Sequence, residues 1–146
     1  MLNLKFASIA GYILMVLAIV SMAISGSLLA SGYILILIQL LAVMLMVWAR
    51  ITFGRRSFHF EATTTQGELV TTGPYAFLRH PIYASLLCFI WAGVLSHLST
   101  TSFCAAVIFS AGIAVRIYSE EHFLSLRYPN YPDYAKRTKR IIPYIY

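Results

Sequence analysis

Two long stretches without any Lys, Arg, Asp or Glu constrain the fold of this chain more than any other feature. The first covers 44 residues, from position 6 to position 49, and the second covers 36 residues, from position 80 to position 115. A helix needs about 20 largely apolar residues to cross a bilayer. Each stretch is therefore long enough for two membrane-spanning helices and too long for one.

The composition agrees with a membrane protein and excludes other classes. Hydrophobic residues make up 60% of the 146 residues, and charged residues make up only 11%. A soluble domain is roughly 45–50% apolar and about 25% charged, so this chain has too few charges to cover a water-exposed surface. Intrinsic disorder and collagen-like or disulfide-rich classes are excluded by the same numbers. Cys88 and Cys104 have no nearby metal-ligating partners in the sequence, and we expect both to be small buried apolar side chains.

Small polar residues indicate where each charge-free stretch turns. Ser25-Gly26-Ser27 and Ser31-Gly32 divide the first stretch, and residues 96–100 divide the second. The spans expected from these divisions are residues 6–24, 33–49, 81–95 and 101–118. The third span is short for a bilayer, so it is expected to tilt, to lie shallow or to extend by a few residues.

The sequence therefore predicts an all-α integral membrane protein with about four transmembrane helices arranged as two hairpins. We expect residues 1–49 to form an N-terminal transmembrane hairpin. Residues 50–146 carry nearly all the polar chemistry and are expected to form the functional core, with a loop, a second hairpin and a C-terminal segment.

The distribution of positive charge predicts the orientation in the membrane. All eleven Lys and Arg residues lie near the N-terminus, between the two stretches or near the C-terminus, and the hairpin tips carry none. Lys and Arg in short loops mark the cytoplasmic side, so we expect both termini and the site to be cytosolic in a plasma or inner membrane. The alternative is a cleavable signal peptide made of Lys5 and the apolar run that follows it, which the excessive length of that run disfavours.

A turn and a proline predict that polar residues lie at the start of the third span. Gly73-Pro74 is a turn signal, and Pro81 suits the first turn of a helix. Arg79 and His80 would then stand at the helix end, where free N–H groups favour an anionic group. Tyr83 shares a helical face with His80. The alternative is an interfacial anchor, in which the arginine extends to the headgroups and the tyrosine joins an aromatic belt.

The end of the fourth span and the tail carry further polar residues. Arg116 and Glu120 are four residues apart and can pair on a helix, and an ionisable residue at membrane depth is a candidate functional group. A headgroup-facing arginine held by Glu120 is the alternative. Tyrosines spaced by three residues with interleaved prolines over residues 128–134 predict turns or a lip of aromatic rings rather than a continuous helix. Four cations within residues 136–140 are expected to contact anionic lipid headgroups.

Four short motifs follow one another along the last two thirds of the chain, from about position 48 to position 143. They are Leu69-Val70-(x2)-Gly73-Pro74-Tyr75, Arg79-His80-Pro81-Ile82-Tyr83, Arg116-(x3)-Glu120-Glu121 and Tyr131-(x2)-Tyr134-(x5)-Arg140-Ile141-Ile142-Pro143. In this set and order the chain resembles the integral-membrane isoprenylcysteine carboxyl methyltransferases and their prokaryotic relatives, as a compact member without the extra N-terminal helices of the eukaryotic enzymes.

The resemblance implies a site for S-adenosyl-L-methionine at the cytosolic ends of the last helices, beneath the C-terminal segment. The cofactor-binding residues that it implies are Gly67, Glu68, Leu69, Val70, Tyr75, His80, Pro81, Ile82, Tyr83 and Glu120. Arg116 matches the arginine that faces the methyl acceptor and is the candidate catalytic residue, whereas Glu121 keeps the doubled acidic pattern without an assigned role. Residues 58–66 do not align with the family, so prenylated protein is not assumed as the acceptor.

The expected function is methyl transfer from S-adenosyl-L-methionine to a lipophilic small-molecule or lipidated acceptor, for which an isoprenylcysteine-like carboxylate is one candidate. Such a reaction is largely a positioning task, and an arginine can grip a carboxylate with two hydrogen bonds. Membrane lipids are expected contacts and nucleic acid is not. An NAD(P)H-dependent membrane reductase of the sterol and enone group, with a related His-Pro motif, is one alternative.

Two further alternatives belong to other classes, and one soluble class is disfavoured. A small four-helix transporter would need an acidic residue within a span, which is missing. A non-catalytic membrane subunit with the same fold stays open, because fold does not imply function. No Gly-x-Gly sequence is present, which disfavours a soluble methyltransferase with a Rossmann fold.

Overall fold

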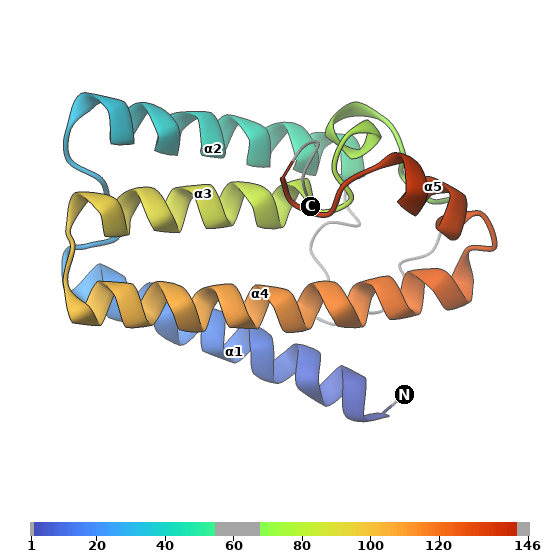
Figure 1. Ribbon diagram of the computed structural model, residues 1–146, viewed down its shortest axis with the longest axis horizontal. Helices are drawn as coiled ribbons and strands as arrows, with labels where there is room; N and C mark the ends of the chain where they lie inside the picture. The colour runs from blue at the N-terminus through green and yellow to red at the C-terminus, as the bar shows by residue number, and fades with distance from the viewer. Residues whose placement is uncertain (1, 55–67, 143–146) are drawn as a thin grey trace.

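The computed structural model describes residues 2–54 and 68–142, and its elements are helices joined by short connections. The elements are α1 (Leu2–Ile24), α2 (Tyr33–Phe53), the 3₁₀ turn η2 (Gly73–Ala76), α3 (Pro81–Ser96), α4 (Thr100–Arg127) and α5 (Tyr131–Arg137) (Figure 1). Within the described ranges the only β-type pairing is an isolated parallel bridge between Leu78 and Lys139. The expected all-α class is thus confirmed for the part of the chain that the structure describes.

The four long helices pack as two pairs that do not follow the order of the sequence. Helix α1 packs along α4, helix α2 packs along α3, and α3 and α4 join the two pairs. Figure 1 shows the α1–α2 and α3–α4 connections at one end of the bundle and the N-terminus, η2 and α5 at the other. The N-terminal pair of helices therefore makes its main contacts with α3 and α4, and not between α1 and α2 as a separate hairpin would.

Three of the described helices are long and apolar enough to cross a membrane, namely α1, α2 and α4. Helix α3 has 16 residues, which at 1.5 Å per residue is shorter than the roughly 30 Å hydrocarbon layer. The described part of this membrane protein is accordingly all-helical, with three candidate spans and one shorter apolar helix. Helix α4 continues beyond position 118, the expected end of the fourth span, to Arg127, and its last third is polar.

The connections form where the small residues predicted them. Gly32 precedes α2 with a φ of +88°, a left-handed conformation that glycine adopts without strain. Ser99 caps α4: its side chain accepts a hydrogen bond from the backbone N–H of Ser102, while the Ser102 hydroxyl accepts one from the Ser99 backbone N–H. Such reciprocal capping satisfies two of the orphan donors at the start of a helix. These connections place the polar ends of all four helices on the opposite side of the bundle.

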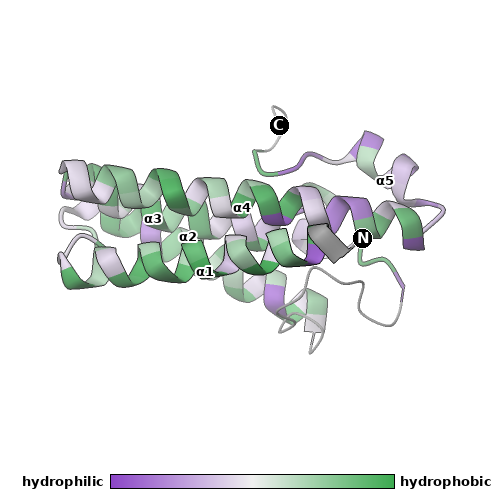
Figure 2. Ribbon diagram, turned by 90° about the horizontal axis from the view of Figure 1, so that it is seen from below, coloured by the Kyte–Doolittle hydropathy of each residue, from purple (hydrophilic) through white to green (hydrophobic). Residues whose placement is uncertain are grey.

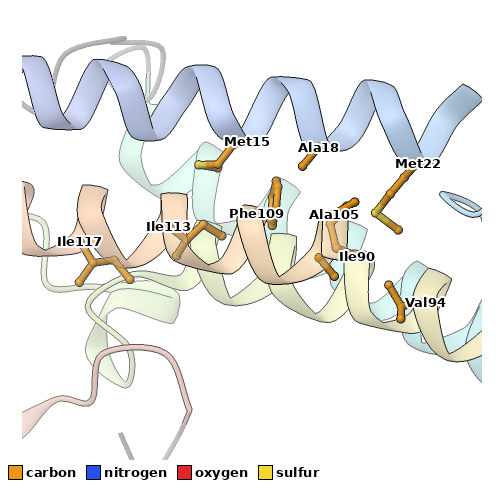
Figure 3. Close-up of a cluster of buried hydrophobic side chains, with 10 residues drawn as sticks. Met15, Ala18, Met22, Ile90, Val94, Ala105, Phe109, Ile113 and Ile117 are labelled. Carbon is orange, nitrogen blue, oxygen red and sulfur yellow. The ribbon is translucent and has the colours of Figure 1, made fainter. Parts of the chain in front are cut away.

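A buried apolar cluster joins α1, α3 and α4. Figure 3 shows most of its members, which are Met15, Ala18, Met22, Ile90, Val94, Ala105, Ala106, Phe109, Ile113 and Ile117. Cys88 and Cys104 are exposed on the outer surfaces of α3 and α4, so the expectation that they are buried is wrong. A thiol behaves as a small apolar group, and it is therefore compatible with a surface that faces lipid as well as with a core.

The polar residues gather at one end of the bundle. In Figure 2 the ribbon is coloured hydrophilic mainly in the C-terminal third of α4 and in α5, whereas the rest of the long helices is mainly hydrophobic. Charged residues of the described chain lie at this end because the helix ends that carry them meet there. This end holds the candidate site.

Candidate active site

The tight turn η2 positions Tyr75, the first residue of the site along the chain. Gly73 has a φ of +58°, and a Cβ atom at this position would lie 2.7 Å from Thr52 Oγ1 on α2, so only glycine fits. Pro74 follows in the first turn of η2, and Tyr75 is buried beside Phe53 with their ring centroids 5.5 Å apart. The turn is thereby fixed against the end of α2, and the chain returns from it to the start of α3.

The predicted helix start at Pro81 is confirmed. Pro81 occupies the first turn of α3, and His80 is its N-cap residue. His80 is only 5% exposed, and its ring centroid lies 5.8 Å from that of Tyr83 one turn further on. The two side chains thus lie on one side of the first turn of α3, as their spacing predicted.

Arg116 and Glu120 of α4 meet Tyr83 of α3 in a hydrogen-bonded triad. Arg116 Nε donates to the Tyr83 hydroxyl at 2.8 Å, and Arg116 Nη2 donates to Glu120 Oε1 at 3.2 Å. The Tyr83 hydroxyl in turn donates to Glu120 Oε1. The predicted pairing of Arg116 with Glu120 is confirmed, and the Arg116 side chain is 6% exposed. A guanidinium that is buried and held from two directions has a fixed orientation.

His80 lies beside both carboxylates of α4. Its Nδ1 is 3.7 Å from Glu120 Oε2, and its Nε2 is 3.4 Å from Glu121 Oε1. Within the described residues, His80 Nε2 is buried without a hydrogen-bond partner of acceptable geometry. Buried polar atoms are nearly always hydrogen-bonded, so such an atom marks a place where a polar ligand group would be favoured.

Glu121 forms a separate ion-pair cluster on the other side of His80. It accepts a hydrogen bond from Arg79 Nε at 2.9 Å and lies 2.9 Å from Arg140 Nη2. Arg79 also donates through Nη1 to the carbonyl oxygens of Ala135 and Thr138, at 2.8 and 2.6 Å. The second carboxylate of the Glu-Glu pair therefore binds the C-terminal part of the chain to the start of α3.

Backbone hydrogen bonds fasten the same C-terminal part, which we call the strap (residues 138–142). Lys139 N–H donates to the Phe77 carbonyl at 3.1 Å, Arg79 N–H donates to the Lys139 carbonyl at 2.7 Å, and His80 N–H donates to the Arg140 carbonyl at 3.1 Å. Ile141 packs against the apolar cluster of the bundle. The strap thus crosses the residues that lead into α3.

The tyrosine-rich tail is more ordered than expected. The helix does break after Arg127, but Tyr131 begins a new helix, α5, with Pro132 in its first turn, a position that proline favours. The predicted break in the helix is therefore confirmed, whereas a short helix stands where turns were expected. Tyr131 and Tyr134 are buried, and the Tyr134 hydroxyl donates to the Tyr75 carbonyl at 2.8 Å. Burial raises the pKa of Tyr134 to about 12, so its hydroxyl stays a neutral donor at neutral pH.

The structure brings some of the predicted cofactor residues together and leaves others apart. His80, Tyr83, Glu120 and Arg116 form one connected group, with Pro81 setting the helix start. Burial raises the pKa of the Tyr75 hydroxyl, with contributions from the nearby Tyr134 and Glu120, which places this residue within electrostatic range of the group. Gly67 lies outside the described residues. The others predicted lie at the edge, with Glu68 exposed and Leu69, Val70 and Ile82 half-buried.

Three residues of the site were not singled out as binding residues by the sequence. Arg79 and Arg140 appeared in the motifs, but their shared partner Glu121 is 42 and 19 positions away along the chain. Tyr12 of α1 lies with its ring centroid 5.6 Å from Arg116 Cζ. An isolated tyrosine in an apolar span gives no signal of such a contact, so only the packing of α1 on α4 reveals it.

The donor and acceptor set fits S-adenosyl-L-methionine. Glu120 is a carboxylate with a quarter of its side chain exposed, suited to the ammonium or ribose hydroxyl groups of the cofactor. His80 Nε2 and the Tyr131 hydroxyl are buried beside Glu121 without a well-aligned hydrogen-bond partner in the described part of the chain. The described residues contain no group of three His, Cys, Asp or Glu side chains able to hold a metal ion.

The described helices form a membrane bundle with a polar site at one end. This site resembles that of an enzyme, because the hydrogen-bonded triad of Arg116, Tyr83 and Glu120 lies beside the ion pairs of Glu121. The family model for phospholipid methyltransferases matches residues 27–131. Because this match covers more than half of the chain, the protein belongs to the phospholipid methyltransferase family, which is a family of membrane methyltransferases related to the isoprenylcysteine carboxyl methyltransferases.

Two curated relatives share about half of the chain. The nickel-cobalt-cadmium resistance protein NccN of Alcaligenes xylosoxydans xylosoxydans is 38% identical over 77 residues, which are 52% of this chain and 36% of that protein. The cobalt-zinc-cadmium resistance protein CzcN of Cupriavidus metallidurans is 33% identical over 76 residues, which are 51% of this chain and 35% of that protein. The matched part thus spans about a third of the length of each relative. No solved structure matches the chain significantly.

Proposed function

We propose that this protein transfers a methyl group from S-adenosyl-L-methionine to a lipophilic acceptor at the cytosolic face of the membrane. The observation that carries the proposal is the triad of Tyr83, Arg116 and Glu120 beside the buried His80. This group lies in the membrane methyltransferase family's matched segment and holds both signs of charge within one hydrogen-bonded network.

The residues of the chain divide into two roles. Glu120, His80 and Tyr83, with Tyr75 and the segment 68–70 at the edge, would bind the cofactor. S-Adenosyl-L-methionine supplies, when bound, a methyl group on a sulfonium centre that a nucleophile displaces directly. The protein contributes orientation and the exclusion of water, which are the usual contributions of a binding site to cofactor chemistry.

Arg116 would orient the acceptor. Its guanidinium is buried, and Tyr83 and Glu120 fix its orientation. An acceptor carboxylate that pairs with this guanidinium would be held beside the cofactor by charge-assisted hydrogen bonds. This favours an acceptor that combines a carboxylate with a lipid chain, as in the carboxyl methyltransferases that the four motifs resemble.

The family match supports methyl transfer over two alternatives that the sequence left open, a nicotinamide-dependent reductase and a small transporter. A non-catalytic subunit with the same fold is tested by the assay below. The names of the two relatives refer to resistance to metal cations. The chain matches only about a third of each relative, so we do not extend a role in metal resistance to it.

A transfer assay tests the proposal. Membranes containing the protein would be incubated with methyl-labelled S-adenosyl-L-methionine and a lipid and membrane-protein extract, followed by separation of the labelled products. We expect label in a lipophilic product, and base-labile label if that product is a carboxyl ester. Label no higher than in membranes without the protein would contradict the proposal. The orientation is tested separately by a C-terminal reporter that is active only outside the cytosol. Activity of that reporter would contradict the cytosolic orientation but not methyl transfer.

A further inference from the structure

The first helix approaches the candidate site although it lies outside the matched segment of the family. The family model begins at residue 27, whereas α1 ends at Ile24. Helix α1 meets α4 where two glycines face each other: a Cβ on Gly112 would lie 2.7 Å from the Gly11 carbonyl oxygen. Small residues at such crossings allow the helix backbones to approach closely. A Cβ on Gly11 would lie 3.6 Å from Arg116 Cγ, so the crossing occurs beside the triad.

The close crossing places an aromatic ring of α1 on Arg116. The Tyr12 ring centroid lies 5.6 Å from Arg116 Cζ, and the Tyr83 ring centroid lies 6.0 Å from the same atom. The guanidinium therefore has aromatic rings from both α1 and α3 within cation–π distance. Tyr12 is also 37% exposed, beside the exposed apolar residues Ile9 and Ile13. It thus extends from the buried guanidinium to the surface that faces lipid.

A buried hydroxyl on the same helix lacks a partner. Ser8 is fully buried, and its Oγ has no hydrogen-bond partner in the described part of the chain. Gly11 faces Gly112, and the Ser119 hydroxyl donates to the Leu4 carbonyl at 3.4 Å. This antiparallel register places Ser8 level with positions 115–116 of α4. An unpartnered hydroxyl at this level costs free energy unless a bound group accepts or donates a hydrogen bond there.

We propose that α1 forms part of the acceptor-binding site, and that Tyr12 and Ser8 determine which lipophilic acceptor reaches Arg116. The inference rests on the proposed function. The acceptor class that fits is a single lipophilic chain ending in a carboxylate: the carboxylate pairs with Arg116, the chain lies against Tyr12 and the exposed apolar surface of α1, and a polar atom near the carboxylate meets Ser8. The acceptor then enters from the bilayer side of α1.

Binding measurements on the purified full-length protein test this inference. The probes are S-farnesyl-N-acetylcysteine, which is a lipophilic carboxylate, and its methyl ester, which has the same chain without the charge. Wild-type protein, Tyr12→Leu, Tyr12→Phe and Ser8→Ala would be compared. Tyr33→Leu is the matched control, because Tyr33 is a tyrosine that is 96% exposed at the start of α2, at the far end of the bundle.

We expect wild-type protein to bind the carboxylate more tightly than the ester. Tyr12→Leu should raise the Kd of the carboxylate roughly 3- to 30-fold, as expected for the loss of a cation–π contact. Tyr12→Phe keeps the ring and should stay within about twofold of wild type. Ser8→Ala should weaken carboxylate binding roughly fivefold. All variants should bind S-adenosylhomocysteine like wild type, which a general structural defect would not allow.

Other results would overturn the inference. Unchanged probe affinities in both Tyr12→Leu and Ser8→Ala would do so, as would a wild-type protein that binds S-adenosylhomocysteine but neither probe. Parallel losses of probe and S-adenosylhomocysteine binding in Tyr12→Phe and Ser8→Ala would assign these residues to folding instead. Failure of the wild-type protein to bind S-adenosylhomocysteine would refute the proposed function itself, and is therefore distinguishable from failure of the inference.

Discussion

Replacing Arg116 with alanine is expected to abolish methyl transfer while leaving most of the cofactor affinity. The side chain is 6% exposed and donates to Tyr83 at 2.8 Å and to Glu120 at 3.2 Å. Each charge-assisted hydrogen bond contributes about 1.5–3 kcal/mol. Loss of a two-bond grip on an acceptor carboxylate would therefore raise the barrier by about 3–6 kcal/mol, which is a decrease in kcat/KM of roughly 10²- to 10⁴-fold.

The effect on the cofactor should be much smaller. Without Arg116, Glu120 still accepts a hydrogen bond from Tyr83 and lies 3.7 Å from His80. We expect the Kd of S-adenosylhomocysteine to rise by less than about tenfold, as for the loss of one neighbouring charge. Arg116→Lys keeps the charge but loses the planar fork, and its activity should lie between those of wild type and Arg116→Ala.

The assay combines single-turnover methyl transfer with calorimetry on the same preparations. Arg127→Ala is the matched control, because Arg127 is an exposed arginine at the end of the same helix and its removal should leave both quantities near wild type. Transfer by Arg116→Ala at the wild-type rate would refute the assigned role. An equal loss of transfer and cofactor affinity would show that Arg116 belongs to the cofactor site instead.

Three further predictions follow from the site and the helix packing. His80→Ala or Glu120→Ala should weaken S-adenosylhomocysteine binding at least roughly tenfold by calorimetry, because each removes a polar group proposed to bind the cofactor, and unchanged affinity would contradict the site. Glu121→Gln should release the strap and lower the free energy of unfolding by about 3 kcal/mol. The Tm should fall and trypsin should cleave faster after Lys139. Unchanged cleavage would contradict the role of Glu121 in holding the strap. Gly112→Ala should destabilise the bundle by about 1–3 kcal/mol, because the added Cβ would lie 2.7 Å from a carbonyl oxygen of α1, and a Tm equal to wild type would contradict this packing.

The features predictable from the sequence are those with short-range causes. The start of α3 at Pro81 follows from the fixed φ and missing N–H of proline. The pairing of Arg116 with Glu120 follows from helical spacing. The charge-free stretches predicted the apolar helices, and α4 continues as a helix for nine residues beyond the expected end of its membrane span. Charged residues can continue a helix into water by the same backbone hydrogen bonds, so composition marks the bilayer edge and not the helix end.

The features that the sequence did not reveal depend on contacts between distant segments. Glu121 gathers Arg79 and Arg140 from two other parts of the chain, and no local pattern predicts that choice. The sequence also does not show which side of each apolar helix packs against other helices, because lipid-facing and core-facing residues are both apolar in a membrane. That ambiguity explains the wrong prediction for Cys88 and Cys104, and also the missed contact of Tyr12 with Arg116.

The central claim is that the polar end of this bundle is a site for S-adenosyl-L-methionine. Calorimetric titration of the purified protein with S-adenosylhomocysteine, the stable product form, tests it most directly. The account predicts saturable binding with one site per chain, weakened in Glu120→Ala and retained in Arg116→Ala. Absence of binding to the folded wild-type protein would contradict it.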